Sequence, residues 1–203
     1  MFKENLFDIS LADYDAVIFD LDGTLVDSMP AHFEAWCVAL DSFGAYNVFA
    51  EDVFYAMGGR PTRDIVRDLN GECDVHLDAE AVGAAKRKAF MGNLDRIKPI
   101  TEVIEFAKHV RGKLPMAVAT GGSRNVAEKT LKQVNISDLF DEVVTANDVK
   151  KGKPNPDIYF DVAERLGVKP ERCLVFEDAP AGIEAALAAG MEVITVPSPL
   201  SVV

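Results

Sequence analysis

Five short, largely apolar runs recur along the chain, and stretches with the apolar spacing of helices separate most of them. The runs lie at residues 16–19, 116–119, 142–145, 173–176 and 192–196. Runs without polar alternation are typical of strands covered on both faces, as in a parallel sheet between layers of helices. The helical spacing predicts helices at 101–110, 123–133, 155–166 and 180–189. We therefore predict an α/β fold with a doubly wound, mostly parallel sheet.

The alternation of strands and helices is interrupted between residues 29 and 98. This interval contains no comparable apolar run, only helical patterns near 31–43, 62–69 and 79–94. A crossover between two parallel strands needs only about a dozen residues, so an interval of this length is an insertion with its own fold. We predict that residues 29–98 form a helical cap and that residues 1–28 and 99–203 form the α/β core.

Composition restricts the partners. The chain has 203 residues, 49% of them hydrophobic, and a net charge of −12 at pH 7. Such a charge disfavours nucleic acid and anionic membranes as partners, so an anionic ligand needs local positive charge or a metal. Cys37, Cys73 and Cys173 form no C-x-x-C pair and indicate reduced thiols. Residues 1–15 lack the pattern of a signal peptide, and no window resembles a membrane span. We expect a cytoplasmic monomer.

Polar side chains follow four of the predicted strands, at ends that a parallel sheet brings together. They are Asp20 and Asp22, Thr120 with Gly121 and Gly122, Lys153 in the next loop, and Glu177 with Asp178. Carboxylate oxygens suit Mg²⁺, which would offset the repulsion between the acids. Glycines ahead of a helix expose N–H groups that bind anions. The set predicts a Mg²⁺ ion and a small phosphorylated substrate at this edge.

Several of these residues also have a plainer interpretation. Aspartates at a strand end often bond their own backbone in a turn, and Lys153 could be an ordinary surface lysine. Glu177 could be a solvated neighbour of Asp178. Ser28 is predicted to cap the first helix of the insertion.

Four segments resemble the ordered motifs of a known family. They are "DLDGTLVDS" from residue 20, "VATGGSR" from 118, "KGKPNPDIY" from 151 and "VFEDAPAGIEAALAAGM" from 175. They resemble the haloacid dehalogenase-like superfamily, and most of all its β-phosphoglucomutase-like branch of sugar phosphatases and mutases. One such motif is a weak signal, but four in order are specific. The resemblance covers nearly the whole chain, including "PAHFEAW" at residues 30–36.

The resemblance implies roles for the residues at the strand ends. Asp20 would be the nucleophile, and Asp22 the general acid and then the base. Thr120 and Lys153 would bind the phosphate, beside the N–H groups at Gly121. The implied Mg²⁺ ligands are Asp20, the main-chain carbonyl of Asp22, Asp178 and, through water, Glu177.

In the cap, the resemblance points to three further residues. His32 matches a histidine that helps to position Asp22, and "AMGGRPTRD" at residues 56–64 matches a loop that reaches over the active site. Mutases carry a lysine in this loop where this chain has Met57 or Gly58, so only Arg60 and Arg63 supply charge for a substrate. This departure favours a phosphatase over a mutase.

The leading hypothesis is a Mg²⁺-dependent phosphatase acting on small phosphomonoesters, such as sugar phosphates, through an aspartyl-phosphate. One alternative is a mutase that returns the phosphoryl group to the sugar. Another is a receiver-like protein that holds a phosphoryl group without turnover. The spacing of Asp20 and Asp22 and the large insertion argue against the receiver.

Overall fold

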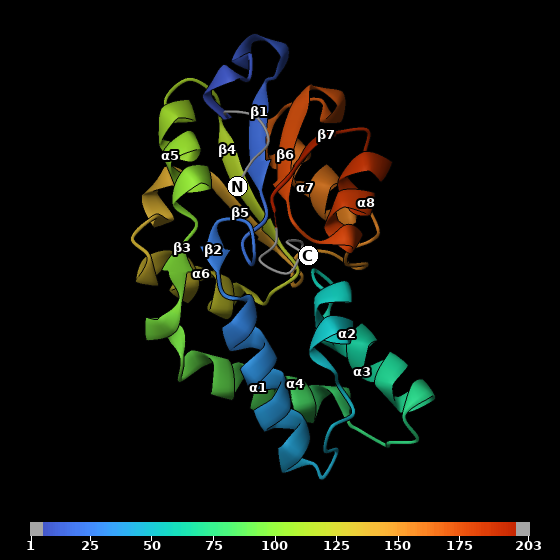
Figure 1. The fold of residues 1–203 in the computed structure, drawn as a ribbon. Coiled ribbons are helices and arrows are strands. Elements are labelled where there is room, and N and C mark those ends of the chain that lie inside the picture. The colour runs from blue at the N-terminus through green and yellow to red at the C-terminus, as the bar shows by residue number, and fades with distance from the viewer. Residues whose placement is uncertain (1–5, 198–203) are drawn as a thin grey trace.

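Five parallel strands form the central sheet of the protein, in the order β5-β4-β1-β6-β7 (Figure 1). The computed structural model describes residues 6–197. The strands are β1 Ala16–Phe19, β4 Met116–Thr120, β5 Glu142–Thr145, β6 Cys173–Glu177 and β7 Glu192–Thr195. Every predicted strand lies within a residue of its observed bounds. The predicted α/β fold is confirmed, and β1 is its central strand.

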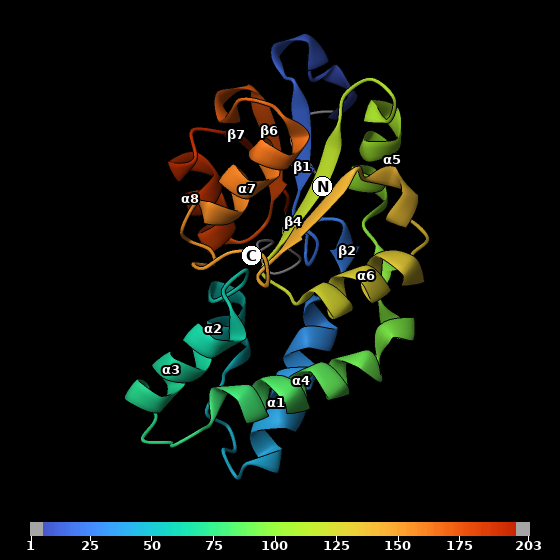
Figure 2. The same ribbon diagram turned by 180° about the vertical axis from the view of Figure 1, so that it is seen from behind.

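Helices cover both faces of the sheet. They are α5 Thr101–Val110 and α6 Arg124–Gln133 on one face, and α7 Asp157–Leu166 and α8 Pro180–Ala188 on the other (Figure 2). Successive side chains of a strand point to opposite faces. Val17 and Phe19 therefore pack with α5 and α6, and Ala16 and Ile18 pack with α7 and α8. All four are fully buried, which explains the unbroken apolar run.

Two predicted helix starts are slightly early. Ser123 and Pro156 are the N-cap residues that precede the two helices, so α6 and α7 begin one residue after them. Gly167 ends α7, because its left-handed backbone (φ 68°) does not continue the helix. Within residues 6–197, five short 3₁₀ helices complete these elements: Leu6–Asp8, Leu11–Asp13, Leu94–Arg96, Ser137–Leu139 and Pro170–Arg172.

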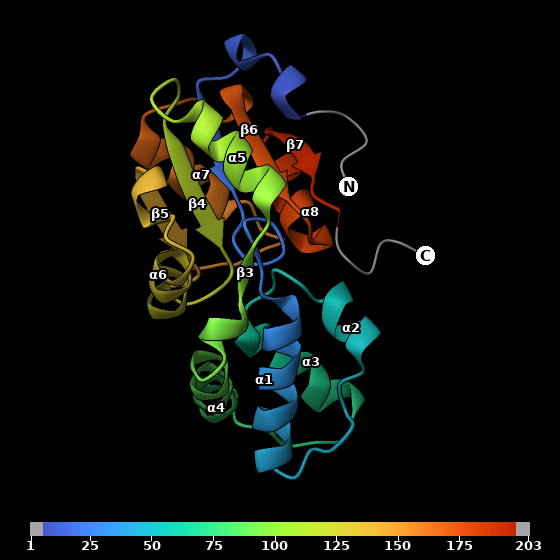
Figure 3. The same ribbon diagram turned by 60° about the vertical axis from the view of Figure 1, so that its left-hand side comes forward.

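Four helices occupy the predicted insertion and gather at the end of the sheet where the strands terminate (Figure 3). They are α1 Met29–Ser42, α2 Glu51–Ala56, α3 Thr62–Glu72 and α4 Ala79–Met91. They enclose an apolar core of their own that includes Trp36, Leu40 and Phe54. The sequence did not predict α2. The division of the chain into core and cap stays a prediction.

A two-stranded antiparallel ribbon lies where the insertion leaves and rejoins the sheet. It pairs β2, Val26–Asp27, with β3, Lys98–Pro99. The sequence did not predict this ribbon either, because two residues are too few to produce a pattern. Within residues 6–197, no helix has the combined length and apolarity that crossing a bilayer requires.

Candidate active site

Lys153 is the centre of a buried cluster at the carboxyl ends of the strands. Its Nζ donates to Asp20 Oδ1 at 2.7 Å, to Glu177 Oε1 at 2.5 Å and to the Ala119 carbonyl at 3.1 Å. Burial would lower the pKa of Lys153, but Asp20 and Glu177 raise it well above its usual value. The ammonium group therefore stays charged. The alternative of a surface lysine is wrong, because this side chain is fully buried.

Glu177 is the last residue of β6, and its carboxylate is fixed on both oxygens. Oε2 accepts from the Ala179 N–H at 2.8 Å, and Oε1 accepts from the Tyr159 hydroxyl at 3.4 Å as well as from Lys153. The side chain is completely buried. Glu177 is therefore not a solvated neighbour of Asp178, and its position is set by the fold.

Three carboxylates of this cluster form a group that suits a metal ion. Oxygen atoms of Asp20, Glu177 and Asp178 all lie within 4.8 Å of one another. Burial, and then the charge of Glu177, raise the pKa of Asp178 to about 7. Burial also raises the pKa of Asp20, against the attraction of Lys153. One ammonium group facing three carboxylates leaves an excess of negative charge, and the oxygen donor set fits a hard divalent cation.

Asp22 faces different partners from Asp20. Its Oδ1 accepts from the Ser28 hydroxyl at 2.6 Å and from His32 Nε2 at 3.0 Å. His32 comes from α1, and its ring stacks on Phe90 of α4 with 3.9 Å between centroids. Ser28 does occupy the N-cap position of α1, but its hydroxyl makes no capping bond. The predicted capping role of Ser28 is therefore wrong, and the hydroxyl orients Asp22 instead.

The protonation of the Asp22–His32 pair follows from its surroundings. Burial lowers the pKa of His32, although Asp22 opposes this effect. His32 Nδ1 is buried and has no hydrogen-bond partner among the described residues, which suits a neutral ring protonated on Nε2. Burial would raise the pKa of Asp22, but His32 and Ser28 lower it to about 2. A neutral ring acts on Asp22 through its hydrogen bond, and this bond, the bond from Ser28 and the nearby charge of Lys86 together favour the carboxylate.

The segment between β4 and α6 has the geometry of an anion-binding loop. The Gly122 N–H donates to Thr120 Oγ1 at 3.0 Å. Across residues 6–197, no acceptor is bonded to the N–H groups of Gly121 and Ser123. Free N–H groups at the start of a helix attract anions. A side chain at Gly121 would collide with the carbonyl of Gly59, so only glycine allows this close approach.

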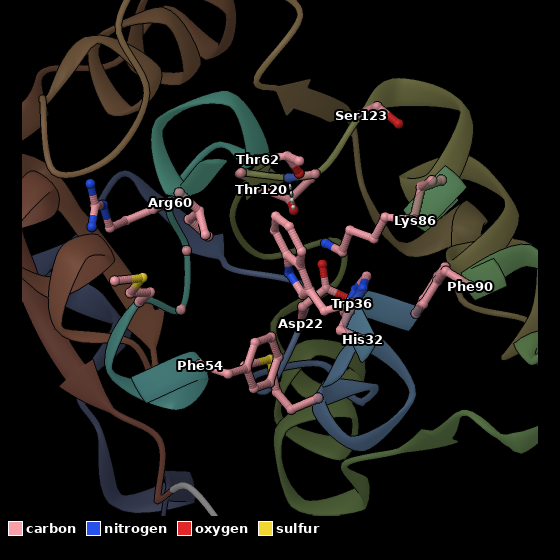
Figure 4. Close-up of a pocket in the computed structure, with 18 of the residues that line it drawn as sticks. Asp22, His32, Trp36, Phe54, Arg60, Thr62, Lys86, Phe90, Thr120 and Ser123 are labelled. Atoms are coloured by element: carbon pink, nitrogen blue, oxygen red, sulfur yellow. Dashed lines mark hydrogen bonds and ion pairs between the residues drawn. The ribbon is translucent and has the colours of Figure 1, made fainter. Parts of the chain in front are cut away.

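These groups line one side of a cavity whose other side is formed by the insertion (Figure 4). The apolar wall consists of Met29, Trp36, Phe54, Met57, Ile65 and Phe90. Trp36 is both buried in the apolar core of the insertion and part of this wall.

Lys86 is a cavity residue that the sequence reasoning missed. It extends from α4 towards Asp22 and His32 in Figure 4, and its Nζ lies 5.1 Å from the centroid of the Trp36 ring. Burial lowers the pKa of Lys86 to about 8, although Asp22 attracts the charged form. One signal was available: Lys86 lies midway between Val82 and Phe90, at four-residue spacing on the buried face of α4.

The two arginines predicted to contact the substrate do not converge on Asp22. Arg60 lines the cavity, but it forms an ion pair with Asp68, and its guanidinium points away from Asp22 in Figure 4. Arg63 is exposed, donates to the Lys150 carbonyl at 2.9 Å and borders a neighbouring hollow. Their role with a substrate stays a prediction.

Comparisons with known proteins agree with this fold. A family model described as a haloacid dehalogenase-like hydrolase matches residues 14–190. Fructose-1-phosphate phosphatase YqaB of Escherichia coli K12 is 38% identical over 185 residues, which cover 90% of this chain and 96% of that protein. The phosphorylated carbohydrates phosphatase of Thermotoga maritima is 37% identical, with 88% and 82% covered. A putative β-phosphoglucomutase structure from Bacteroides vulgatus has a TM-score of 0.79 and 30% identity, with 90% and 75% covered.

The chain therefore belongs to the haloacid dehalogenase-like hydrolases. The resemblance to the β-phosphoglucomutase-like branch is confirmed, and so is the predicted enzyme class, a phosphatase that acts on phosphoric monoesters.

Proposed function

We propose that this protein is a Mg²⁺-dependent phosphatase that hydrolyses phosphomonoesters of small carbohydrates through an aspartyl-phosphate on Asp20. The observation that carries the proposal is that Asp20, Asp22 and the free N–H groups beside Thr120 meet in one cavity, with Lys153 behind them. The names of the two phosphatase relatives support carbohydrate phosphates as the substrate class. A cytoplasmic location and a monomeric state stay predictions.

In the first step, Asp20 attacks the phosphorus atom of the ester. Lys153 holds Oδ1 of Asp20, which leaves Oδ2 available as the nucleophile. The bond between phosphorus and the leaving oxygen breaks, and protonated Asp22 gives its proton to that oxygen. A bound phosphate dianion raises the pKa of Asp22 from its low value in the free protein, because like charges disfavour the ionised form. Proton transfer of this kind contributes about 10²- to 10⁴-fold to the rate.

In the second step, water attacks the aspartyl-phosphate. Asp22 is now ionised and takes the proton from the attacking water, while phosphate leaves and Asp20 is restored. The hydrogen bonds from Ser28 and His32 hold Asp22 in one orientation for both transfers. The N–H groups of Gly121 and Ser123 bind the phosphoryl oxygens in each step. The three donors of Lys153 are engaged by Asp20, Glu177 and the Ala119 carbonyl, so Lys153 attracts the phosphoryl group through its positive charge.

Asp20, Asp178 and Glu177 would hold the Mg²⁺ ion, together with the main-chain carbonyl of Asp22. When bound, the cation neutralises the charge that develops on the transferring phosphoryl group. The surplus of carboxylates over ammonium groups in the buried cluster supports a divalent ion at this position.

The positions of Arg60 and Arg63 favour hydrolysis over a mutase reaction. A mutase must bind a second phosphate, and the sequence offered these two arginines for that purpose. Arg60 is engaged by Asp68, and Arg63 by the Lys150 carbonyl.

The proposal is tested by measuring phosphate release from a panel of ketose, aldose and hexitol phosphates with Mg²⁺. We expect turnover of at least one sugar phosphate and a loss of at least about 1,000-fold in kcat for Asp20→Asn. Asp22→Asn should still permit slow labelling of Asp20. The matched control is Asp15→Asn, since Asp15 lies just before the same strand but is half exposed and pairs with Arg172.

Other outcomes would overturn the proposal. Isomerisation of a sugar phosphate that depends on a bisphosphate activator, with no net phosphate release, would identify a mutase. A phosphoprotein that lasts for minutes to hours without turnover would identify a receiver. Full activity of Asp20→Asn would remove the nucleophile.

A further inference from the structure

Helix α6, whose N-terminus faces the phosphate site, is capped by a residue from a different loop. Ser123 holds the N-cap position with extended backbone, yet its hydroxyl makes no capping bond. That hydroxyl is buried and has no partner within the described part of the chain. Instead, the Arg124 N–H donates to Asn147 Oδ1 at 3.0 Å. Asn147 belongs to the loop after β5.

The loop that carries Asn147 is itself fixed against the phosphate-binding segment. On one side of Asn147, the Ala146 N–H donates to the Gly122 carbonyl at 3.2 Å. On the other side, Asp148 Oδ2 accepts from Arg124 Nη2 and from the Thr145 hydroxyl, both at 2.7 Å. Arg165 of α7 lies 3.4 Å from Asp148 Oδ1. Asn147 is thus held between two points that are both bonded to the segment from Gly122 to Arg124.

We propose that Asn147 is a positioning residue for phosphate binding, which acts by fixing the first turn of α6 through the Arg124 N–H. An uncapped helix terminus frays, and donors that must be ordered during binding give weaker affinity than donors already in place. The Asn147 bond therefore keeps the free N–H groups of Gly121 and Ser123 directed at the phosphate. This inference rests on the proposed function, because it takes the segment to be the phosphate site.

The test compares wild type with Asn147→Ala in binding of inorganic phosphate with Mg²⁺, by calorimetry, alongside the Tm of each protein. Asn147 also borders a neighbouring hollow, which the rest of a phosphate ester could reach. Inorganic phosphate has no such group, so a change in its Kd reports on the phosphate site alone. A cap contributes about 1 kcal/mol, which corresponds to about a fivefold change in affinity. We expect the Kd for phosphate to rise by about fivefold. The KM for a hydrolysed ester should rise by a similar factor.

Two further variants test whether a weaker affinity for phosphate comes from loss of the cap on α6, and not from altered charge or from a general loss of stability. Asn147→Asp keeps an acceptor oxygen, so at about 0.5 M NaCl, where exposed charges are screened, its Kd should fall between those of wild type and Asn147→Ala. Glu128→Gln removes the 3.6 Å ion pair of Glu128 with Arg124 Nη1 but leaves the cap in place. Its Kd should equal that of wild type.

The inference is overturned if Asn147→Ala binds phosphate like wild type, even with a lowered Tm, because Asn147 would then be only structural. It is also overturned if Asn147→Asp binds no better than Asn147→Ala in high salt. If wild type hydrolyses esters in either case, the proposed function stands. If wild type neither binds phosphate nor hydrolyses any ester, the proposed function fails and this inference fails with it.

Discussion

Asp20 and Asp22 lie two residues apart but have opposite surroundings. Asp20 is bonded to an ammonium group and lies beside two other carboxylates, whereas Asp22 is bonded to a hydroxyl and an imidazole. Leu21 between them is fully buried in the core. The two acids therefore lie close together in space but in different environments, so each can take a different part in the same reaction.

Ser28→Ala tests how far the orientation of Asp22 matters. The hydroxyl lies 2.6 Å from Asp22 and does not cap α1. A hydrogen bond to a charged group contributes about 1.5–3 kcal/mol, so we expect kcat to fall by at least about tenfold. The loss of this bond should also lower the Tm by several degrees. Steady-state kinetics and a thermal melt check both expectations.

The matched control for this variant is Ser42→Ala, in the last turn of the same helix. Its hydroxyl donates to the Ala39 carbonyl at 2.6 Å and is remote from Asp22. It should leave kcat unchanged. If Ser28→Ala also leaves kcat unchanged, Ser28 has no part in orienting Asp22.

Site residues that stand in a recognisable sequence motif could be predicted from the sequence. Residues whose role depends on a partner far away along the chain could not. The acids and Lys153 stood at strand ends in recognisable motifs. Lys86 lies in a helix where lysines are ordinary, and Asn147 lies in an exposed loop with no motif. Their positions follow from contacts with Trp36 and Arg124, which only the folded chain brings close.

At the scale of elements, the loop between α2 and α3 makes tight contacts with loops of the core. A side chain on Gly152 would collide with the ring of Pro61, and one on Gly121 with the carbonyl of Gly59. Gly59 itself has a φ of 77°, which favours glycine. The insertion therefore packs against the core at two core glycines, Gly121 and Gly152.

Gly152→Ala should disturb this approach. We expect kcat/KM to fall by at least about tenfold, because small displacements of catalytic groups have large effects on rate. The double variant Gly152→Ala with Pro61→Ala removes the ring that the new methyl group would meet, and should recover most of the activity. Steady-state kinetics on both variants decide this. Equal losses in both would contradict the steric explanation.

Gly71→Ala, in α3, is the control for replacing a glycine with alanine. Apart from its chain neighbours and the backbone of its own helix turn, no heavy atom lies within 4 Å of the new methyl group. Alanine is favoured over glycine in a helix by up to about 1 kcal/mol, so stability should rise slightly and activity should not change.

The elements that were predicted and those that were missed differ in length and in burial. The core strands are buried on both faces and so left unbroken apolar runs in the sequence. Helix α2 spans six residues, of which only Phe54 is buried. The ribbon of β2 and β3 depends on pairing between residues about 70 positions apart along the chain. No local pattern can specify such pairing.

At the scale of the whole molecule, the carboxylate cluster adds to a net charge of −12. A cation bound at 100 times its Kd stabilises a folded protein by about 2.7 kcal/mol. For a chain of this size, that raises the Tm by about 5–10 °C. We therefore expect Mg²⁺ to raise the Tm, and EDTA to reverse the rise and abolish turnover. Melting curves at matched ionic strength check this.

Asp178→Asn provides the internal control for the metal prediction. It keeps an oxygen that can accept the 3.1 Å hydrogen bond from Thr24 but removes one of the three negative charges. Without Mg²⁺ this variant should melt at a higher temperature than wild type, and Mg²⁺ should shift its Tm much less. An unchanged Mg²⁺ shift would place the ion elsewhere.

The central place of β1 in the sheet also has a consequence for how the chain acquires its shape during synthesis. Both neighbours of β1 come late, since β4 begins at Met116 and β6 at Cys173. Helices α1 to α4 are translated before either neighbour, and contacts between nearby segments form faster than distant ones. Helices α1 to α4 can therefore take shape on the ribosome first, whereas Asp20 and Asp22 meet Lys153, Glu177 and Asp178 only after β6 has been translated.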